Sequence, residues 1–285
     1  MKVAIASGKG GTGKTFLSTN LAAYMSESIP TVLIDLDVEE PNSGLFIKGE
    51  LLYSEPAYKQ CPDWDKQNCL MCGKCQSLCN YHAVIKVKDE IFVFPELCHS
   101  CYACSELCQT DSLPMKKKRI GSITHYKFNR LDYVEGRLDI GQEQAVPLIS
   151  QTNDFPAKHL QNVISICDCP PGTACPAIES VKDADLVILT TEPTPFGLHD
   201  LKLIVKSLII LKKKFAVVVN KWGVGNDDVL KYCESKNITV VAKIPNDRRI
   251  AEEYSMGNLV YDNFGLFRTE LDKIKNYILN SGGKK

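Results

Sequence analysis

Residues 8–15, Gly8-Lys9-Gly10-Gly11-Thr12-Gly13-Lys14-Thr15, decide the fold of this chain. They match the phosphate-binding pattern Gly-x-x-x-x-Gly-Lys-Ser/Thr, and they stand between a short β run, Lys2–Ala6, and a segment of helical periodicity, Phe16–Ser26. Glycines let backbone N–H groups surround phosphate oxygens, and the start of the helix adds the positive end of its dipole. Lys14 is expected to reach the β- and γ-phosphates of ATP, and the Thr15 hydroxyl to bind Mg²⁺.

Runs of Val, Ile and Leu alternate with helical patterns over most of the remaining chain. Strands are predicted at Thr31–Ile34, Val163–Ile166, Leu186–Thr190, Phe215–Val219 and Thr239–Ile244, and helices at 198–211, 229–236 and 267–279. Near-continuous apolar strands between helices are typical of a parallel sheet that is covered on both faces. The predicted fold class is therefore α/β with a mostly parallel sheet. Residues 120–141 predict short strands or a hairpin.

The composition is that of a folded domain. Of the 285 residues, 44% are hydrophobic and 24% are charged, and the formal net charge is zero at pH 7. Binders of nucleic acid or of membrane surfaces normally carry a basic surplus, so neither nucleic acid nor stable membrane anchoring is expected. No signal peptide or transmembrane stretch is expected either, which predicts a cytoplasmic protein.

Thirteen cysteines are too many for an ordinary protein of a reducing compartment, where disulfides are rare. Two runs share one spacing: Cys69-x-x-Cys72-x-x-Cys75-x-x-x-Cys79 and Cys98-x-x-Cys101-x-x-Cys104-x-x-x-Cys108. In ferredoxins with this spacing, three thiolates of one run and the fourth cysteine of the other run hold each cluster. We therefore expect two 4Fe-4S clusters, one on Cys69, Cys72, Cys75 and Cys108, and the other on Cys98, Cys101, Cys104 and Cys79.

Zinc is the alternative for these thiols, because Cys-x-x-Cys pairs also bind Zn²⁺. The duplicated spacing is not a usual zinc pattern and favours iron–sulfur clusters. The proline that usually follows the fourth cysteine is absent, and Asn80 and Gln109 stand there instead. Proline supplies no ligand, so this departure leaves the predicted ligands unchanged.

With its additional lysine, the loop from Lys9 to Thr15 resembles the deviant Walker A motif of the superfamily that contains MinD, ParA, Mrp and the nitrogenase iron protein. The resemblance implies an ATPase in which Lys9 crosses the interface of an ATP-dependent homodimer and neutralises charge during phosphoryl transfer. A solvated loop lysine is the alternative. Phe16 departs from the small hydroxyl residue of many relatives, but its backbone N–H can still face phosphate.

Four further segments extend the resemblance. Asp35-Leu36-Asp37 is similar to switch I, which implies that Asp37 orients the attacking water beside Mg²⁺. Asp168-Cys169-Pro170-Pro171-Gly172 is similar to Walker B followed by switch II, which implies that Asp168 holds Mg²⁺ through water. A turn carboxylate without a catalytic role is the alternative for Asp37. The segments 217–221 and 244–247 resemble the base-binding strand and loop, which implies that Asn220 contacts adenine and that Pro245 and Asp247 line its site.

The whole chain resembles the MinD-superfamily ATPases with an inserted ferredoxin domain. The resemblance implies a P-loop ATPase domain of residues 1–55 and 112–285, interrupted at residues 56–111 by a ferredoxin-like module with two 4Fe-4S clusters.

Outside the two runs stand five thiols: Cys61, Cys167, Cys169, Cys175 and Cys233. Cys167 and Cys233 are expected to be small buried hydrophobes. Cys175 has the same offset from Asp168 as a nitrogenase iron-protein ligand of a cluster shared across the dimer, and a thiol without metal is the alternative. Cys61 is expected to be a free thiol near the module, or a partner contact.

Three functions remain open on the sequence alone. An ATP-gated electron-transfer protein would act on an unidentified redox partner. A carrier of clusters or metallocofactors would deliver them to an acceptor, although no C-terminal Cys-x-x-Cys motif is present. A positioning switch like MinD or ParA would use its clusters as redox sensors. The module is inserted between the two switch segments, where nucleotide state is felt, and this favours the first function.

Overall fold

The computed structural model describes residues 1–282 and contains a nine-stranded sheet in the order β11-β10-β9-β1-β8-β2-β7-β6-β3. Its strands are β1 (Lys2–Ala6), β2 (Thr31–Asp35), β3 (Glu50–Pro62), β6 (Met115–Phe128), β7 (Leu131–Leu138), β8 (Ile164–Asp168), β9 (Leu186–Thr191), β10 (Phe215–Trp222) and β11 (Val240–Pro245). Neighbours from β11 to β7 are parallel, and the pairs β7–β6 and β6–β3 are antiparallel. The prediction of an α/β fold with a mostly parallel sheet is confirmed.

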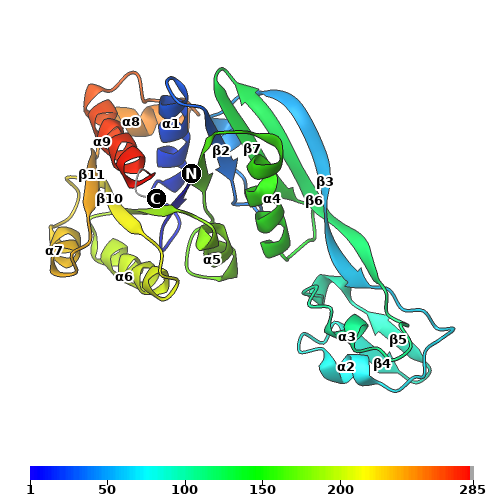
Figure 1. Ribbon diagram of the computed structural model, residues 1–285. Helices are drawn as coiled ribbons and strands as arrows, with labels where there is room; N and C mark the ends of the chain where they lie inside the picture. Colours follow the sequence, from blue (N-terminus) through cyan, green and yellow to red (C-terminus); the bar gives the residue numbers. More distant parts are fainter. Residues whose placement is uncertain (283–285) are drawn as a thin grey trace.

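Helices cover both faces of this sheet (Figure 1). One face carries α1 (Lys14–Ser26), α8 (Arg248–Ser255) and α9 (Gly265–Gly282), and the other carries α4 (Val146–His159), α5 (Cys175–Lys182), α6 (Pro195–Ile210) and α7 (Asp228–Ser235). Because side chains alternate along a strand, Val3 and Ile5 of β1 enter the first core, and Ala4 and Ala6 enter the second. This two-sided burial explains why apolar residues occupy successive positions of these strands and not only alternate ones.

The last helix packs its apolar stripe onto the sheet. Phe267, Leu271, Ile274 and Ile278 of α9 are fully buried. Within residues 1–282, no helix combines the length and apolar character that crossing a membrane requires.

A long hairpin carries the cysteine-rich segment away from the sheet. β3 pairs with β6 over almost its whole length, whereas β7 pairs only with residues 121–128 of β6. The far half of the hairpin is therefore a two-stranded ribbon, at whose end Figure 1 shows a separate lobe. The lobe, residues 63–114, contains α2 (Lys74–Leu78), β4 (Val84–Val87), β5 (Glu90–Val93) and α3 (Ala103–Glu106). We call it the cysteine lobe.

The cysteine lobe has a small apolar core. Its main cluster consists of Val84, Ile91, Leu113 and Cys104, and other cysteines pack against these side chains. β3 continues through residues 55 and 56, between which the sequence predicts the start of the module. The division of the chain into domains stays a prediction.

Candidate functional site

The phosphate-binding loop lies at the carboxyl edge of the sheet. β1 runs into it, and the neighbouring strands β8 and β2 end at Asp168 and Asp35. β1 itself stands between β8 and β9. In open α/β sheets, ligands bind outside the carboxyl ends of the strands, where neighbouring connections diverge. The topology therefore brings the loop and both carboxylates to one site.

Glycines shape the phosphate-binding loop. Gly11 and Gly13 have φ angles of 79° and 91°, which side chains with a Cβ rarely adopt. A Cβ on Gly13 would also lie 2.2 Å from Nδ2 of Asn220, whereas a Cβ on Gly10 or Gly11 would meet nothing within 4 Å. The loop is thus fixed on one side and open on the other, as a phosphate cradle requires.

Asp168 lies buried beneath this loop and fits a magnesium site. Its Oδ2 accepts a hydrogen bond from Ser43 Oγ at 3.3 Å, while its Oδ1 is buried without a hydrogen-bond partner. Burial raises the pKa of Asp168 to about 6, although the Thr15 hydroxyl and the Lys14 ammonium lower it. A buried, unpaired carboxylate oxygen beside a threonine hydroxyl is a donor set that Mg²⁺ accepts.

Asp35 and Asp37, in the segment predicted to be switch I, have carboxylates near that of Asp168. Burial and the Asp168 carboxylate raise the pKa of Asp35 well above its usual range. Asp35 accepts hydrogen bonds from the backbone N–H groups of Ser43, at 2.9 Å, and Asp37, at 3.1 Å. Asp35 therefore orders the segment that carries Asp37. Burial raises the pKa of Asp37 as well, and the Lys14 ammonium opposes this shift.

Lys9 folds back onto its own chain. Its Nζ lies 3.9 Å from Glu192 Oε2 and 6.0 Å from the ring centre of Phe196. Lys221 binds the same carboxylate through Oε1 at 2.5 Å. The side chain of Lys9 is 34% exposed, so it can leave Glu192 without breaking a buried contact.

A pocket of about 330 Å³ opens beside the loop and brings together the residues predicted to bind the base. It is lined by Gly11, Gly13, Lys14, Thr15, Phe16, Asn220, Lys221, Ile244, Pro245, Asn246, Asp247, Ile250, Ala251 and Tyr254. The ring of Phe16 is buried and stacks on Phe267 at 5.0 Å, which anchors the start of α1. Tyr254 contacts the edge of the same ring, and no sequence motif marks it.

Two of these residues are engaged in structural contacts. Asn220 donates from Nδ2 to the Thr12 carbonyl at 2.9 Å, so it braces the phosphate loop. Asp247 accepts from the Arg249 backbone at 2.9 Å and caps α8, and the hydrogen bond with the Arg249 side chain keeps its pKa below the usual value. The adenine contact of Asn220 stays a prediction.

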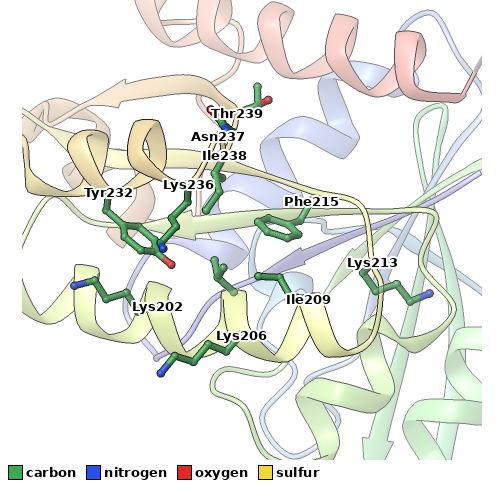
Figure 2. Close-up of a pocket in the computed structure, with 11 residues that line it drawn as sticks. Lys202, Lys206, Ile209, Lys213, Phe215, Tyr232, Lys236, Asn237, Ile238 and Thr239 are labelled. Atoms are coloured by element: carbon green, nitrogen blue, oxygen red, sulfur yellow. The ribbon is translucent and has the colours of Figure 1, made fainter.

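A larger cavity of about 790 Å³ lies elsewhere, between α6 and α7 (Figure 2). Phe215 and Thr239, which line it, stand at the amino ends of β10 and β11, on the edge opposite the phosphate loop. Lysines surround it, and Lys202 lies 5.4 Å from the ring centre of Tyr232. It contains none of the predicted site residues, so the smaller pocket is the nucleotide candidate.

In the cysteine lobe, thiols of both runs lie close together, and Cys69, Cys75 and Cys79 pack against the cluster that contains Cys104. Burial raises the pKa of Cys104 to about 11. The neighbouring thiols of Cys98, Cys101 and Cys79 contribute to this shift. Cys79 belongs to the first run, so the fourth cysteine lies with the other run, as the ferredoxin pattern requires. Burial likewise raises the pKa of Cys75, to which the thiols of Cys69 and Cys72 contribute.

The two cysteine runs have the same pattern of backbone conformation. Positive φ angles occur at Met71, Gly73 and His82, with values of 52°, 75° and 53°. They recur 29 residues later at Ser100, Tyr102 and Asp111, with 53°, 62° and 51°. Alternating left- and right-handed residues turn successive N–H groups into one concavity, a geometry found at many iron–sulfur sites.

Hydrogen bonds to sulfur repeat as well. The backbone N–H of Ala83 donates to Cys79 Sγ at 3.2 Å. At the equivalent position, burial alone would raise the pKa of Cys108, but backbone N–H donors of Thr110 and Ser112 bring it below the usual value. Such N–H groups stabilise a thiolate and influence the potential of a cluster bound to it.

These observations fit cluster ligation, but they do not form a compact site for one ion. Among residues 1–282, no three side chains of His, Cys, Asp and Glu are grouped so as to hold a single metal ion. In a cubane the thiolates bond to different irons and stand further apart than the ligands of one ion. The clusters and their ligands stay predictions.

The remaining thiols differ in exposure. Cys167 and Cys233 are buried, as expected of small apolar side chains. Cys169 is buried as well, and Cys175 is exposed at the start of α5. Cys61 is buried beside Cys98, and burial together with that neighbour raises its pKa to about 11.

A glycine loop between a strand and a helix, with a buried carboxylate on the neighbouring strand, defines a P-loop nucleotide-binding protein. The chain belongs to the CbiA family, the CobQ/CobB/MinD/ParA nucleotide binding domain, which matches residues 3–260.

Similar proteins match almost the whole chain. The uncharacterized protein MJ0579 of Methanocaldococcus jannaschii is 32% identical and covers 98% of each chain. The septum site-determining protein MinD of Pyrococcus horikoshii, complexed with Mg-ADP, has a TM-score of 0.61 at 17% identity and covers 99% of this chain and 97% of that chain. An ATP complex of a Cyanothece McdA variant has a TM-score of 0.57 at 15% identity and covers 97% of this chain and 95% of that chain. These two structures share the fold of this chain.

Proposed function

We propose that the protein binds and hydrolyses ATP as a homodimer and couples this cycle to electron transfer through two 4Fe-4S clusters. The observation that carries the proposal is the attachment of the thiol-bearing lobe. Its hairpin joins the sheet at β7, the neighbour of β2, and β2 leads into Asp37. A conformational change in switch I would therefore occur next to the strand at which the hairpin joins the sheet.

The nucleotide half of the proposal follows from the residues of the loop. Backbone N–H groups of residues 10–15 bind the phosphates, and Lys14 neutralises the β- and γ-phosphates. Thr15 and Asp168 would hold Mg²⁺, which neutralises phosphate charge when it is bound. Asp37 orients a water molecule toward the γ-phosphorus. The new P–O bond forms as the bond to the β–γ bridging oxygen breaks, giving ADP and phosphate.

Dimerisation follows from Lys9. Its ammonium rests on Glu192 of the same chain. A partner chain that faces the loop can accept Lys9 at its γ-phosphate, where the charge is worth most in the transition state. Bound nucleotide in the Pyrococcus MinD and Cyanothece McdA structures supports a nucleotide in the equivalent pocket here.

The redox half follows from the thiols. Cys69, Cys72, Cys75 and Cys108 would hold one cluster, and Cys98, Cys101, Cys104 and Cys79 the other. When bound, such clusters supply one-electron transfer. Burial, followed by the neighbouring thiols, raises the pKa of Cys75 and Cys104, and a cationic iron core would oppose this by stabilising the thiolates.

Redox titration of anaerobically purified protein tests the coupling. The midpoint potential of at least one cluster should shift between the ADP-bound and ATP-bound states, and reduction of an electron acceptor should change in rate. Identical potentials and rates in both states would eliminate the proposal. Transfer of iron and sulfide to an apo-acceptor would instead identify a cluster carrier.

A further inference from the structure

Lys59, on the ribbon part of β3, is only 4% exposed although its side chain ends in an ammonium group. Its Nζ donates to the carbonyl of Pro95 at 2.6 Å, the carbonyl of Cys98 at 3.2 Å and Oε1 of Gln144 at 2.9 Å. These three acceptors come from the loop of the second cysteine run and from the segment before α4. Lys59 therefore fastens that loop to the body of the protein.

Gln144 completes the fastening. Its Oε1 accepts from Lys59, and its Nε2 donates to the Glu96 carbonyl at 3.0 Å. A second glutamine, Gln151 of α4, donates to the Tyr58 carbonyl at 2.9 Å. The amino-terminal half of α4 is thus bonded to β3 and, through Gln144, to residues 95–98. Only the Lys59 end of this network is buried, and because Lys59 has three acceptors there, the connection between residues 95–98, β3 and Gln144 is rigid at that end.

The other side of α4 faces the nucleotide switches. A groove of about 530 Å³ is lined by Ala145 and Ile149 at the start of the helix, by residues 36–40 of switch I, and by residues 170–176 of switch II. Val38 is 1% exposed, its carbonyl accepts from Leu138 N at 2.9 Å, and its side chain shares the space above Gly136 with Thr152 of α4. Movement of switch I must therefore displace α4 or open a cavity.

The two cysteine runs differ in how they are bonded to the hairpin. Ser100 Oγ donates to the Gln60 carbonyl, a further tie between the second run and β3. In the described part of the chain, no hydrogen bond or ion pair joins residues 66–79 to β3, to β6 or to the segment around Gln144. The first loop is therefore held only by its own lobe.

We propose that Lys59 and Gln144 are positioning residues that transmit nucleotide-dependent displacement of α4 to the loop of Cys98, so that the second cluster responds to ATP and the first does not. This rests on the proposed function. The loop sets the solvent access and the hydrogen bonds of the thiolates that it carries, and these two factors influence the reduction potential of the cluster.

The test uses anaerobically purified holoprotein with ADP or with a non-hydrolysable ATP analogue. Redox titration followed by electron paramagnetic resonance should show one nucleotide-sensitive signal of two in the wild type. Gln144→Ala and Lys59→Met should retain both signals and ADP affinity but lose the sensitivity. Lys118→Met is the matched control, because Lys118 pairs with Lys59 across the ribbon and binds the Glu96 carboxylate without contacting Gln144.

Hydrogen exchange provides a readout independent of the potential. Amides of residues 95–101 should change protection with nucleotide in the wild type and in Lys118→Met, but not in Gln144→Ala. Persistent sensitivity in both Gln144→Ala and Lys59→Met, or an equal shift of both clusters in the wild type, would overturn the inference while the proposed function stands. Absence of any nucleotide effect in the wild type would overturn both.

Discussion

The buried carboxylate at the end of β8 sets the expected pH response of the nucleotide-free protein. Burial raises the pKa of Asp168 to about 6, above the ordinary value of 3.8. The folded state then binds the proton more tightly than the unfolded state, so the free energy of unfolding falls as pH rises through about 6. Mg²⁺ would remove this cost by compensating the charge.

Asp168→Asn removes that charge and tests its cost. Without nucleotide at pH 7, the variant should be more stable than the wild type by about 1–3 kcal/mol. The difference should shrink as pH falls toward 4, and Mg·ATP should stabilise the wild type much more than the variant. Thermal unfolding followed by circular dichroism measures this. A variant less stable than the wild type at pH 7 would contradict the assignment.

Lys9 differs from Lys14 in what it is expected to do. Lys14 is buried in the loop, whereas Lys9 is partly exposed and rests on Glu192. Lys9→Ala should leave ADP affinity nearly unchanged and lower kcat for ATP hydrolysis by about 10³-fold or more. Calorimetry and phosphate release measure the two effects. Lys231→Ala, at an exposed lysine near Asp228, is the control, and unimpaired hydrolysis in Lys9→Ala would refute the role.

At the scale of elements, the predicted exchange of fourth cysteines between the two runs has a direct consequence. Cys79 lies with Cys104 although it belongs to the other run. Cys79→Ser and Cys104→Ser should therefore weaken or abolish the same paramagnetic signal, and Cys75→Ser the other. Cys233→Ser, at a buried thiol of α7, should change neither. If Cys79→Ser removed the signal lost in Cys75→Ser, each run would serve its own cluster.

The sequence predicts those elements whose own residues are strongly patterned. β1, β2 and β8 are mostly apolar and almost completely buried, and their predicted positions agree with the structure within about two residues. β3, α4, α5 and α8 are not predicted. Most of β3 is exposed and is held by pairing with β6, and α4 contains Pro156 inside the helix, which disfavours a helical assignment.

The residues of the candidate site also fall into two groups, those that the sequence predicts and those that it does not. The glycine loop and the cysteine runs are contiguous, so spacing alone predicts them. Ser43, Glu192 and Tyr254 reach the site through contacts between distant parts of the chain, and no local pattern marks them. Gln144 and Lys59 are 85 residues apart, and only the folded hairpin brings them together.

At the scale of the whole molecule, the proposed function requires a second copy of the chain. Asp37→Ala should bind Mg·ATP without rapid turnover and should therefore accumulate as a dimer, whereas ADP should leave it monomeric. Light scattering coupled to size exclusion measures the mass. Asp37→Ala combined with Lys14→Ala should stay monomeric with ATP. A mass independent of nucleotide would contradict the dimer.

The central claim is that one chain unites a triphosphate site with two iron–sulfur cubanes. Metal and acid-labile sulfide analysis of the anaerobically isolated, Mg·ATP-binding protein tests it most directly. About eight irons and about eight sulfides per chain are predicted, four of each for either cluster. Stoichiometric zinc without sulfide in protein that still binds Mg·ATP would contradict the account.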